Sequence, residues 1–258
     1  MKFGGASVAT AGHFSQIAEI ILRRARTYKR IAVVVSAMGN TTDELIALAK
    51  EVHQDPPRRE LDMLVSVGER ISISLLAMAL AAKGKEAISF TGSQSGIITS
   101  STHADARIED VRPHRLLSHL DAGKIVIVAG FQGVSREGEI TTLGRGGSDT
   151  TAVALGIALE AEKVEFYKDV KGICAEDPKR NPNAISFPKL SFAETLEIVQ
   201  KGAKVLHPRA VLLAEKNSLP LHLLSFQEPE NLQAGTVVGE RGGVRMKRFE
   251  EEKKSDER

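Results

Sequence analysis

The sequence predicts an α/β fold in which helices cover both faces of a largely parallel sheet. Two observations carry this prediction. Short runs rich in Val and Ile alternate along the chain with longer segments of helical apolar periodicity. Each predicted strand also runs into a loop rich in Gly, Ser, Thr or charged residues, which is where open α/β sheets bind their ligands.

The predicted strands have the high Val and Ile content of strands that are buried on both faces. They cover residues 31–36, 87–90, 125–129, 164–167 and 219–224, and a short start at residues 1–3 precedes them. The predicted helices between them are amphipathic. They cover residues 13–28, 42–52, 61–82, 108–120, 192–200 and 209–216, with a more apolar helix at 150–161.

The composition is that of an ordinary globular chain, with 258 residues, 42% of them hydrophobic and 26% charged. A net charge of +2 gives no electrostatic reason to expect nucleic acid or a membrane surface as a partner. No apolar run approaches the roughly 20 residues that cross a bilayer, and no signal peptide is visible. We therefore expect a cytoplasmic protein. Cys174 is the single cysteine, which excludes an internal disulfide.

The most informative stretch is residues 141–151, TTLGRGGSDTT. Its three glycines allow the backbone to approach an anion closely, and Arg145 offers a planar fork for a carboxylate or a phosphate. Ser148 and Asp149 then open the helix at 150–161, so its N–H groups and dipole point back at the loop. This arrangement predicts an anion-binding site.

A lysine beside a glycine turn forms a second candidate. Lys2 precedes Gly4 and Gly5, and a compact cation in that place suits a transferring phosphate. The alternative is a flexible terminal lysine next to a helix cap. A P-loop is excluded as the phosphate site because the chain has no GxxxxGK[ST] stretch.

Three further features each leave two interpretations open. The Glu69-Arg70 pair interrupts an apolar helix, so it forms a structural salt bridge or binds a substrate ammonium group. Lys168 and Asp169 follow a strand, where an acid holds Mg²⁺ or ribose hydroxyls or merely forms a turn. Lys204 lies in a glycine-led loop and is a second phosphate ligand or a surface charge.

The other reactive side chains do not form a recognisable catalytic or metal-binding motif. His103 and Asp105 have the spacing of a metal-ligand pair, but no third ligand is suitably spaced, so we expect a solvated loop there. His207 precedes a proline, and we expect it to be structural. No Ser/His/Asp or Cys/His arrangement is evident, and Cys174 has no neighbouring histidine to activate it.

Taken in order, these motifs resemble the aspartate kinase branch of the amino acid kinase family. The matching segments are KFGGASV at 2–8, VSAMGNTT at 35–42, GER at 68–70, TGSQSGI at 91–97, and residues 141–149, 168–178 and 202–209. The resemblance runs from Lys2 to Val238 and implies a three-layer αβα sandwich. It also implies a catalytic domain over residues 1–240, with a substrate-binding part at about 1–140, a nucleotide-binding part at about 141–240, and a charged tail at 241–258.

The resemblance implies ATP-dependent phosphorylation of the L-aspartate β-carboxylate with Mg²⁺, the first step of lysine, threonine and methionine biosynthesis. A carboxylate nucleophile is already ionised at neutral pH, so this reaction requires no general base. Alignment and charge neutralisation remain as the tasks of the protein. Two alternatives stay open: a kinase of another small acid, and a nucleotide-binding subunit without activity.

Roles for individual residues also come from the resemblance. Lys2 and Lys204 would stabilise the transferring phosphoryl group, and Asp149 would orient a lysine or the metal. The aspartate-binding residues would be Ser36, Thr42, Glu69, Arg145 and Ser148, with Phe131 lining the pocket. The nucleotide-binding residues would be Gly4, Gly5, Ser7, Lys168, Asp169, Cys174, Asp177, Arg180 and Lys204. No protein residue is assigned as a metal ligand.

The sequence departs from the family pattern at several places. Ala6 stands where the family usually has Thr, Lys168 replaces a common Thr, and Cys174 replaces a Tyr of many members. The family usually has several apolar residues before the motif lysine, where this chain has Met1 alone. The adenine contact and the first strand are therefore the places where we expect this chain to differ.

The family usually continues into paired ACT domains that bind lysine or threonine, and it pairs through helices of the kinase domain. We accordingly expect a homodimer or a higher homo-oligomer, without feedback inhibition through this chain. A naturally short kinase and a catalytic piece with a separate regulatory chain both stay open. Residues 245–258 carry six basic and five acidic residues with one phenylalanine, so we expect a frayed tail or a helical extension.

Overall fold

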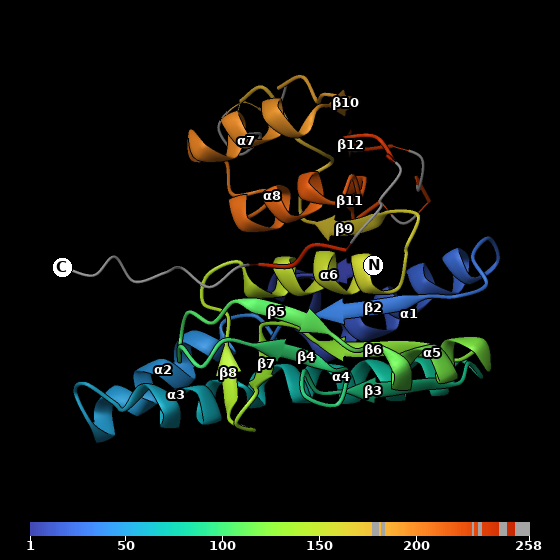
Figure 1. Ribbon diagram of the computed structural model, residues 1–258. Coiled ribbons are helices and arrows are strands. Elements are labelled where there is room, and N and C mark those ends of the chain that lie inside the picture. Colours follow the sequence, from blue (N-terminus) through green and yellow to red (C-terminus); the bar gives the residue numbers. More distant parts are fainter. Residues whose placement is uncertain (177–180, 182–183, 229, 232–233, 243–246, 251–258) are drawn as a thin grey trace.

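The computed structural model describes residues 1–176, 181, 184–228, 230–231, 234–242 and 247–250. An eight-stranded sheet forms its centre, helices cover both faces of that sheet, and a four-stranded sheet lies beside it (Figure 1). The predicted three-layer αβα sandwich is confirmed.

Six strands of the large sheet run parallel to one another. In spatial order they are β11 (Leu221–Ser225), β9 (Val164–Lys168), β1 (Lys2–Phe3), β2 (Ala32–Val35), β6 (Ile125–Ala129) and β3 (Ala87–Phe90). β12 (Thr236–Val238) and β10 (Lys189–Leu190) extend the sheet beyond β11 in the opposite direction. All five predicted strands are present, and the carboxyl ends of the parallel strands share one edge of the sheet.

The central strands are buried on both faces, and alternate side chains enter two separate clusters. In β2, Val33 and Val35 belong to one apolar cluster and Val34 to the other. The first cluster contains α1 (Ala11–Ala25) and α4 (Val67–Ala81). The second contains α5 (His114–Asp121), α6 (Gly147–Ala158), α7 (Phe192–Gln200) and α8 (Pro208–Lys216). The sheet therefore holds one helical layer on each side.

The single helix predicted over residues 108–120 is wrong. The structure has a strand, β5 (Ile108–Val111), followed by the separate helix α5. Pro113 explains the difference, because proline has no N–H for a preceding helical turn and disfavours a helical backbone at Arg112. β5 joins β4 (Ile97–Thr99), β7 (Gln132–Ser135) and β8 (Ile140–Thr142) in the second sheet, whose strands are too short and too polar to stand out in the sequence.

The predicted helix at 61–82 is longer than expected. It runs from Arg58 to Ala81 as α3 (Arg58–Val65) and α4, which meet at Ser66 and follow α2 (Thr41–Val52). By length and composition alone this helix is apolar enough to cross a membrane. However, 44% of its most apolar 18-residue stretch is buried inside the protein. Leu76 and Leu80 are buried against α1 and the sheet, so core packing accounts for part of this composition, while Val67, Ile71 and Met78 remain exposed.

Residues 247–250 lie against the domain, so the expectation of a frayed or helical tail is wrong for this segment. Arg248 donates its N–H to Asn217 Oδ1 at 2.8 Å, and its carbonyl accepts from Asn217 Nδ2 at 2.8 Å. Phe249 packs against the apolar cluster on the α6 side of the sheet. Glu250 donates its N–H to the Ile108 carbonyl at 2.8 Å, as strands do when they pair.

Candidate active site

Four loops meet at the carboxyl edge of the sheet, because β9, β1, β2 and β6 are parallel neighbours. The loop after β1 begins a short 3₁₀ turn (Gly5–Val8), and it contacts the loop after β2. Gly39 donates its N–H to the Gly5 carbonyl at 3.2 Å. A Cβ atom at Gly5 would lie 3.0 Å from the Gly39 carbonyl oxygen, so the close approach depends on glycine. The predicted convergence of polar loops is confirmed.

A cluster of three charges lies at this edge, with Lys2 and Asp149 buried and Lys168 half-buried. Lys2 Nζ, from β1, is 2.7 Å from Asp149 Oδ1, in the first turn of α6. Lys168 Nζ, at the end of the neighbouring strand β9, is 3.3 Å from Asp149 Oδ2. Lys2 is 4% exposed and Asp149 7%. The interpretation of Lys2 as a flexible terminal side chain is therefore wrong.

The electrostatics of this cluster favour an anion. Burial by itself would raise the pKa of Asp149, but the ammonium groups of Lys168 and Lys2 outweigh burial and hold that pKa well below its usual range. Burial lowers the pKa of Lys2, with Asp149 opposing and Lys168 reinforcing the shift. One ionised carboxylate between two lysines gives the cluster a net charge of +1, which a phosphate would balance.

Glu69 brings a second buried carboxylate to the same edge, from the first turn of α4. Its Oε1 accepts the Ala37 N–H at 3.1 Å, and its Oε2 has no hydrogen-bond partner among the described residues. Burial raises the pKa of Glu69 to about 7, against the opposing effects of backbone hydrogen bonds and Lys2. Neither Glu69 nor Arg70 forms an ion pair within the described part of the chain, so the structural salt bridge is not present there.

The glycine loop, residues 144–147, leads from β8 into α6. Gly146 has φ +73° and caps the helix, which begins at Gly147 and not at residue 150. A Cβ at Gly146 would lie 2.0 Å from His207 Cγ, so only glycine allows the loop to pack on that ring. His207 itself caps α8, since its Nδ1 accepts the Arg209 N–H at 3.4 Å, in agreement with its expected structural role.

Several residues predicted to bind the acidic substrate surround this loop. Arg145 is exposed and has no partner among the described residues. Ser148 lies against the end of β6, where a Cβ at Gly130 would be 2.7 Å from the Ser148 hydroxyl oxygen. Phe131 follows Gly130 with φ +71° and faces Gly147, whose added Cβ would meet its ring at 3.0 Å.

The remaining predicted residues of the first two loops lie beside the charged cluster. A Cβ at Gly4 would be 3.4 Å from Lys2 Nζ, so this glycine borders the lysine ammonium group. Ser7 is buried and donates its hydroxyl to the Gly4 carbonyl at 2.7 Å, which stabilises the turn. Ser36 and Thr42 are both half-buried; Ser36 directly follows β2, and Thr42 lies in the first turn of α2.

Other predicted site residues are not drawn into the cluster. Lys204 is exposed in the turn between α7 and α8, and its side chain has no hydrogen bond or ion pair among the residues described. Asp169 is exposed. Cys174 is half-buried, and burial raises the pKa of its thiol, which makes it a poor nucleophile. Asp177 and Arg180 lie outside the described residues.

A buried acid that the sequence motifs do not reveal supports the glycine loop. Asp62 of α3 accepts the Thr142 hydroxyl through Oδ1 and the Ala104 N–H at 3.2 Å. Its Oδ2 is 2.7 Å from His103 Nδ1, so the His103 side chain is half-buried in an ion pair, while Thr102 and Asp105 of the same loop are exposed as expected. A lone acid within the apolar run LDMLV was the signal that could have revealed it.

The described residues offer no metal cage. No group of three or more His, Cys, Asp and Glu side chains is placed to hold a metal ion in the part of the chain that the structure describes. Asp149 is already bonded by two lysines, which compete with a cation for its oxygens. The residues present therefore do not fit a magnesium site built by the protein alone.

Comparison with known proteins agrees with this geometry. The family model described as the amino acid kinase family matches residues 1–225. The chain belongs to the amino acid kinase family. Among curated relatives, the aspartokinase of Mycolicibacterium smegmatis is 52% identical over 238 residues, which are 92% of this chain and 56% of the relative.

Solved aspartate kinases have the same fold. The structure from Synechocystis has a TM-score of 0.82 and 44% identity, over 95% of this chain and 40% of that chain. E. coli aspartokinase III in complex with aspartate and ADP also has a TM-score of 0.82, with 28% identity, over 94% of this chain and 64% of that one. This amino acid kinase chain thus spans little more than half the length of the curated relatives it matches.

Proposed function

We propose that this chain phosphorylates the β-carboxylate of L-aspartate with ATP and forms 4-phospho-L-aspartate and ADP. The observation that supports this proposal is the Lys2–Asp149–Lys168 cluster. It has one net positive charge, and it lies where the glycine loop leads into α6. Relatives named aspartokinase, about 50% identical, support aspartate as the acceptor. A solved relative binds aspartate and ADP together.

The substrate acid is assigned to the face of the site formed by α4 and the glycine loop. The Oε2 atom of Glu69, which lacks a partner among the described residues, would accept the substrate ammonium group. The exposed guanidinium of Arg145 would bind a carboxylate. The hydroxyls of Ser36, Thr42 and Ser148 would complete the hydrogen bonding, and Phe131 would line the pocket.

In the proposed reaction an oxygen of the β-carboxylate attacks the γ-phosphorus, and the bond to the bridging oxygen breaks as ADP leaves. No proton is transferred, because the nucleophile is already an anion at neutral pH. Lys2 would neutralise charge on the phosphoryl oxygens, and Asp149 would hold Lys2 in place. Lys204, an exposed cation in a turn, is assigned as the second lysine on the phosphoryl group.

The nucleotide is assigned to the loops after β1 and β9 and to the nucleotide-binding part of the chain, about residues 141–240. The assigned residues are Gly4, Gly5, Ser7, Lys168, Asp169, Cys174 and, by resemblance alone, Asp177 and Arg180. Mg²⁺ would arrive on the triphosphate, as it often does in phosphotransferases, and would supply further neutralisation of its charge.

Trapping of the acyl phosphate with hydroxylamine tests this proposal. The purified chain with ATP, Mg²⁺ and aspartate should form a hydroxamate and release ADP in equal amounts. Lys2→Ala and Lys204→Ala should each reduce turnover by about 100-fold or more, since each removes a charge from the transition state. An absence of hydroxamate at all protein and substrate concentrations would contradict it.

A panel of acceptors separates the alternatives. If Glu69 binds the ammonium group, Glu69→Gln should raise KM for aspartate about ten-fold or more, and it should not change turnover of succinate, which lacks that group. Turnover of a different acid in preference to aspartate would identify the chain as a kinase of another small acid. Tight nucleotide binding without turnover of any acid would identify a non-catalytic subunit.

We further propose that two copies of this chain associate through α3 and α4. Met63, Val67, Ile71 and Met78 are large apolar side chains that remain exposed on this continuous helix, and they recur at spacings of four or seven residues. Light scattering at micromolar concentration should give twice the chain mass of 27.9 kDa. Ile71→Glu should shift that mass to the monomer, and a monomeric unmodified protein would contradict the assignment.

A further inference from the structure

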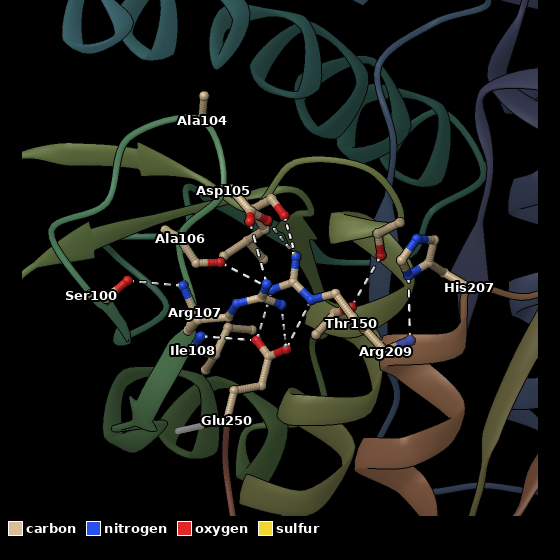
Figure 2. A network of polar contacts seen from close by, with 12 residues as sticks. Ser100, Ala104, Asp105, Ala106, Arg107, Ile108, Thr150, His207, Arg209 and Glu250 are labelled. Carbon is tan, nitrogen blue, oxygen red and sulfur yellow. Dashed lines mark hydrogen bonds and ion pairs between the residues drawn. The ribbon is translucent and has the colours of Figure 1, made fainter. Parts of the chain in front are cut away.

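Arg209, in the first turn of α8, is the centre of a polar network (Figure 2). All five N–H groups of its guanidinium have an acceptor. Nε and Nη2 bind the two oxygens of Glu250, at 2.9 and 3.0 Å. Nη2 also donates to the Ala106 carbonyl at 3.0 Å, and Nη1 donates to the Leu143 carbonyl and to Asp105 Oδ1 at 3.4 Å.

These acceptors belong to segments that are far apart in the chain. Leu143 is the residue before the glycine loop. Ala106 donates its N–H to the Thr142 carbonyl at 2.9 Å, and the stretch before it covers Gly144, where a Cβ would lie 2.9 Å from the Ala104 carbonyl oxygen. Arg209 therefore joins the glycine loop to its neighbouring loop, and Glu250 joins both to the C-terminal residues.

The charge balance makes Glu250 the main counter-ion of this network. Its side chain is 12% exposed, and it also lies 3.7 Å from the guanidinium of Arg107. The other acid of the network, Asp105, is 59% exposed and therefore well screened by water. Without Glu250, two largely buried guanidinium groups would share one exposed carboxylate, and a buried charge without its partner is strongly destabilising.

We propose that Arg209 and Glu250 are a positioning pair for the glycine loop. Arg248 and Phe249 anchor Glu250 to the domain, Glu250 orients the Arg209 fork, and the fork fixes the Leu143 carbonyl at the base of the loop. The loop carries Arg145 and leads to Ser148, which are assigned above to the acid substrate. Residues 247–250 thus control the order of the glycine loop. They also control affinity for the acid substrate, and only this second consequence rests on the proposed function.

Amide hydrogen exchange measures loop order without any activity. The amides of Leu143 and Gly147 are hydrogen-bonded, to the carbonyls of Phe131 and Gly144 at 2.9 and 3.1 Å, so their protection is measurable. Glu250→Gln, which keeps the side-chain shape and removes the charge, should accelerate their exchange about ten-fold. Arg209→Lys should do the same, because an ammonium group has three donors and no fork.

The matched control is Glu240→Gln. It makes the same chemical change at an exposed ion pair with Lys189, and exchange at the glycine loop should stay unchanged. In an active enzyme Glu250→Gln should raise KM for the acid about ten-fold and leave kcat and KM for ATP within two-fold. Faster exchange at residues 247–250 with unchanged exchange at Leu143 and Gly147 would overturn the proposal, whether or not the chain phosphorylates aspartate.

Discussion

Asp149 is the residue that connects both lysines of the proposed site. Its two carboxylate oxygens contact Lys2 and Lys168, which lie on the neighbouring parallel strands β1 and β9. Its ionisation is secured by these contacts and not by solvent, because the side chain is almost completely buried. The position therefore serves the stability of the edge as well as its charge.

Asp149→Asn should lower the free energy of unfolding by about 3–5 kcal/mol, because two cations lose their shared buried counter-charge. Turnover should fall about 100-fold or more, since Lys2 loses the group that orients it. Chemical denaturation and the ADP-release assay measure the two effects. Asp121→Asn, which breaks an exposed pair with Arg30, is the control and should change neither. An Asp149→Asn protein with normal turnover would disprove the positioning role.

Glu69 makes the stability of the protein depend on pH. Its pKa in the folded state, about 7, lies above the ordinary value of 4.5, so the folded protein binds this proton more tightly than the unfolded chain. The resulting stabilisation is complete below about pH 4.5 and is lost as the pH rises through 7. Between pH 5 and 8 the free energy of unfolding should fall by on the order of 3 kcal/mol through this group.

Urea unfolding at several pH values from 5 to 8 tests this dependence. The buried amino group of Met1, whose pKa burial lowers to about 6, adds the opposite slope to every variant, so each variant is compared with the unmodified protein. Glu69→Gln should remove the decline that Glu69 contributes, because the amide does not titrate. Glu19→Gln should preserve it, since Glu19 is exposed and Lys83 lowers its pKa out of this pH range. Parallel curves for the unmodified and Glu69→Gln proteins would show that burial does not perturb Glu69.

At the scale of elements, the glycine loop depends on two separate properties of Gly146. The residue has a left-handed backbone, and its missing side chain leaves room for the His207 ring. Other turns also have a left-handed backbone, but only the missing side chain allows the start of α6 to pack on the start of α8. Close packing of these helix ends brings the two loops before them together.

Gly146→Ala and Gly138→Ala separate these properties. Both positions have positive φ, +73° and +90°, but an added Cβ at Gly138, in the turn between β7 and β8, has no atom within 4 Å. Gly138→Ala should cost about 1 kcal/mol from backbone strain alone. Gly146→Ala should cost at least 2 kcal/mol more and reduce turnover about ten-fold or more, as measured by denaturation and ADP release. Equal costs would mean that the His207 contact contributes nothing.

At the scale of the whole molecule, a single large sheet joins the two parts assigned to substrate and nucleotide. β1 of the first part pairs directly with β9 of the second, and both apolar clusters contain residues from each part. Residues 247–250 add a further connection through Ile108 and Asn217. The two parts therefore share one core and do not form independent units.

We expect one cooperative unfolding transition in spite of the chain length, because each part would lose its paired strands and half of its core without the other. Far-UV circular dichroism reports all helices, and tyrosine fluorescence reports the two tyrosines, half-buried Tyr28 and Tyr167, which is fully buried beside Phe3. The two probes should give the same denaturant midpoint. Saturating ATP should shift both midpoints together, since a ligand stabilises only the state that binds it. Separate midpoints would contradict a shared core.

The sequence by itself determined the alternation of strands and helices, the parallel sheet and the loop TTLGRGGSDTT. Local apolar periodicity and glycine chemistry decide these features, and both are visible in a short window. It did not reveal the second sheet, whose strands have three or four residues and borrow their stability from neighbours. Pro113 separates β5 from α5, and apolar periodicity alone does not show this break.

Only the tertiary structure decided which charges meet. Lys2, Asp149 and Lys168 are separated by long stretches of chain, and the order of strands in the sheet brings them together. The same holds for Glu250 with Arg209 and for His103 with Asp62. Side-chain pairing across such distances depends on strand order and on burial, because a buried charge without a partner is strongly destabilising.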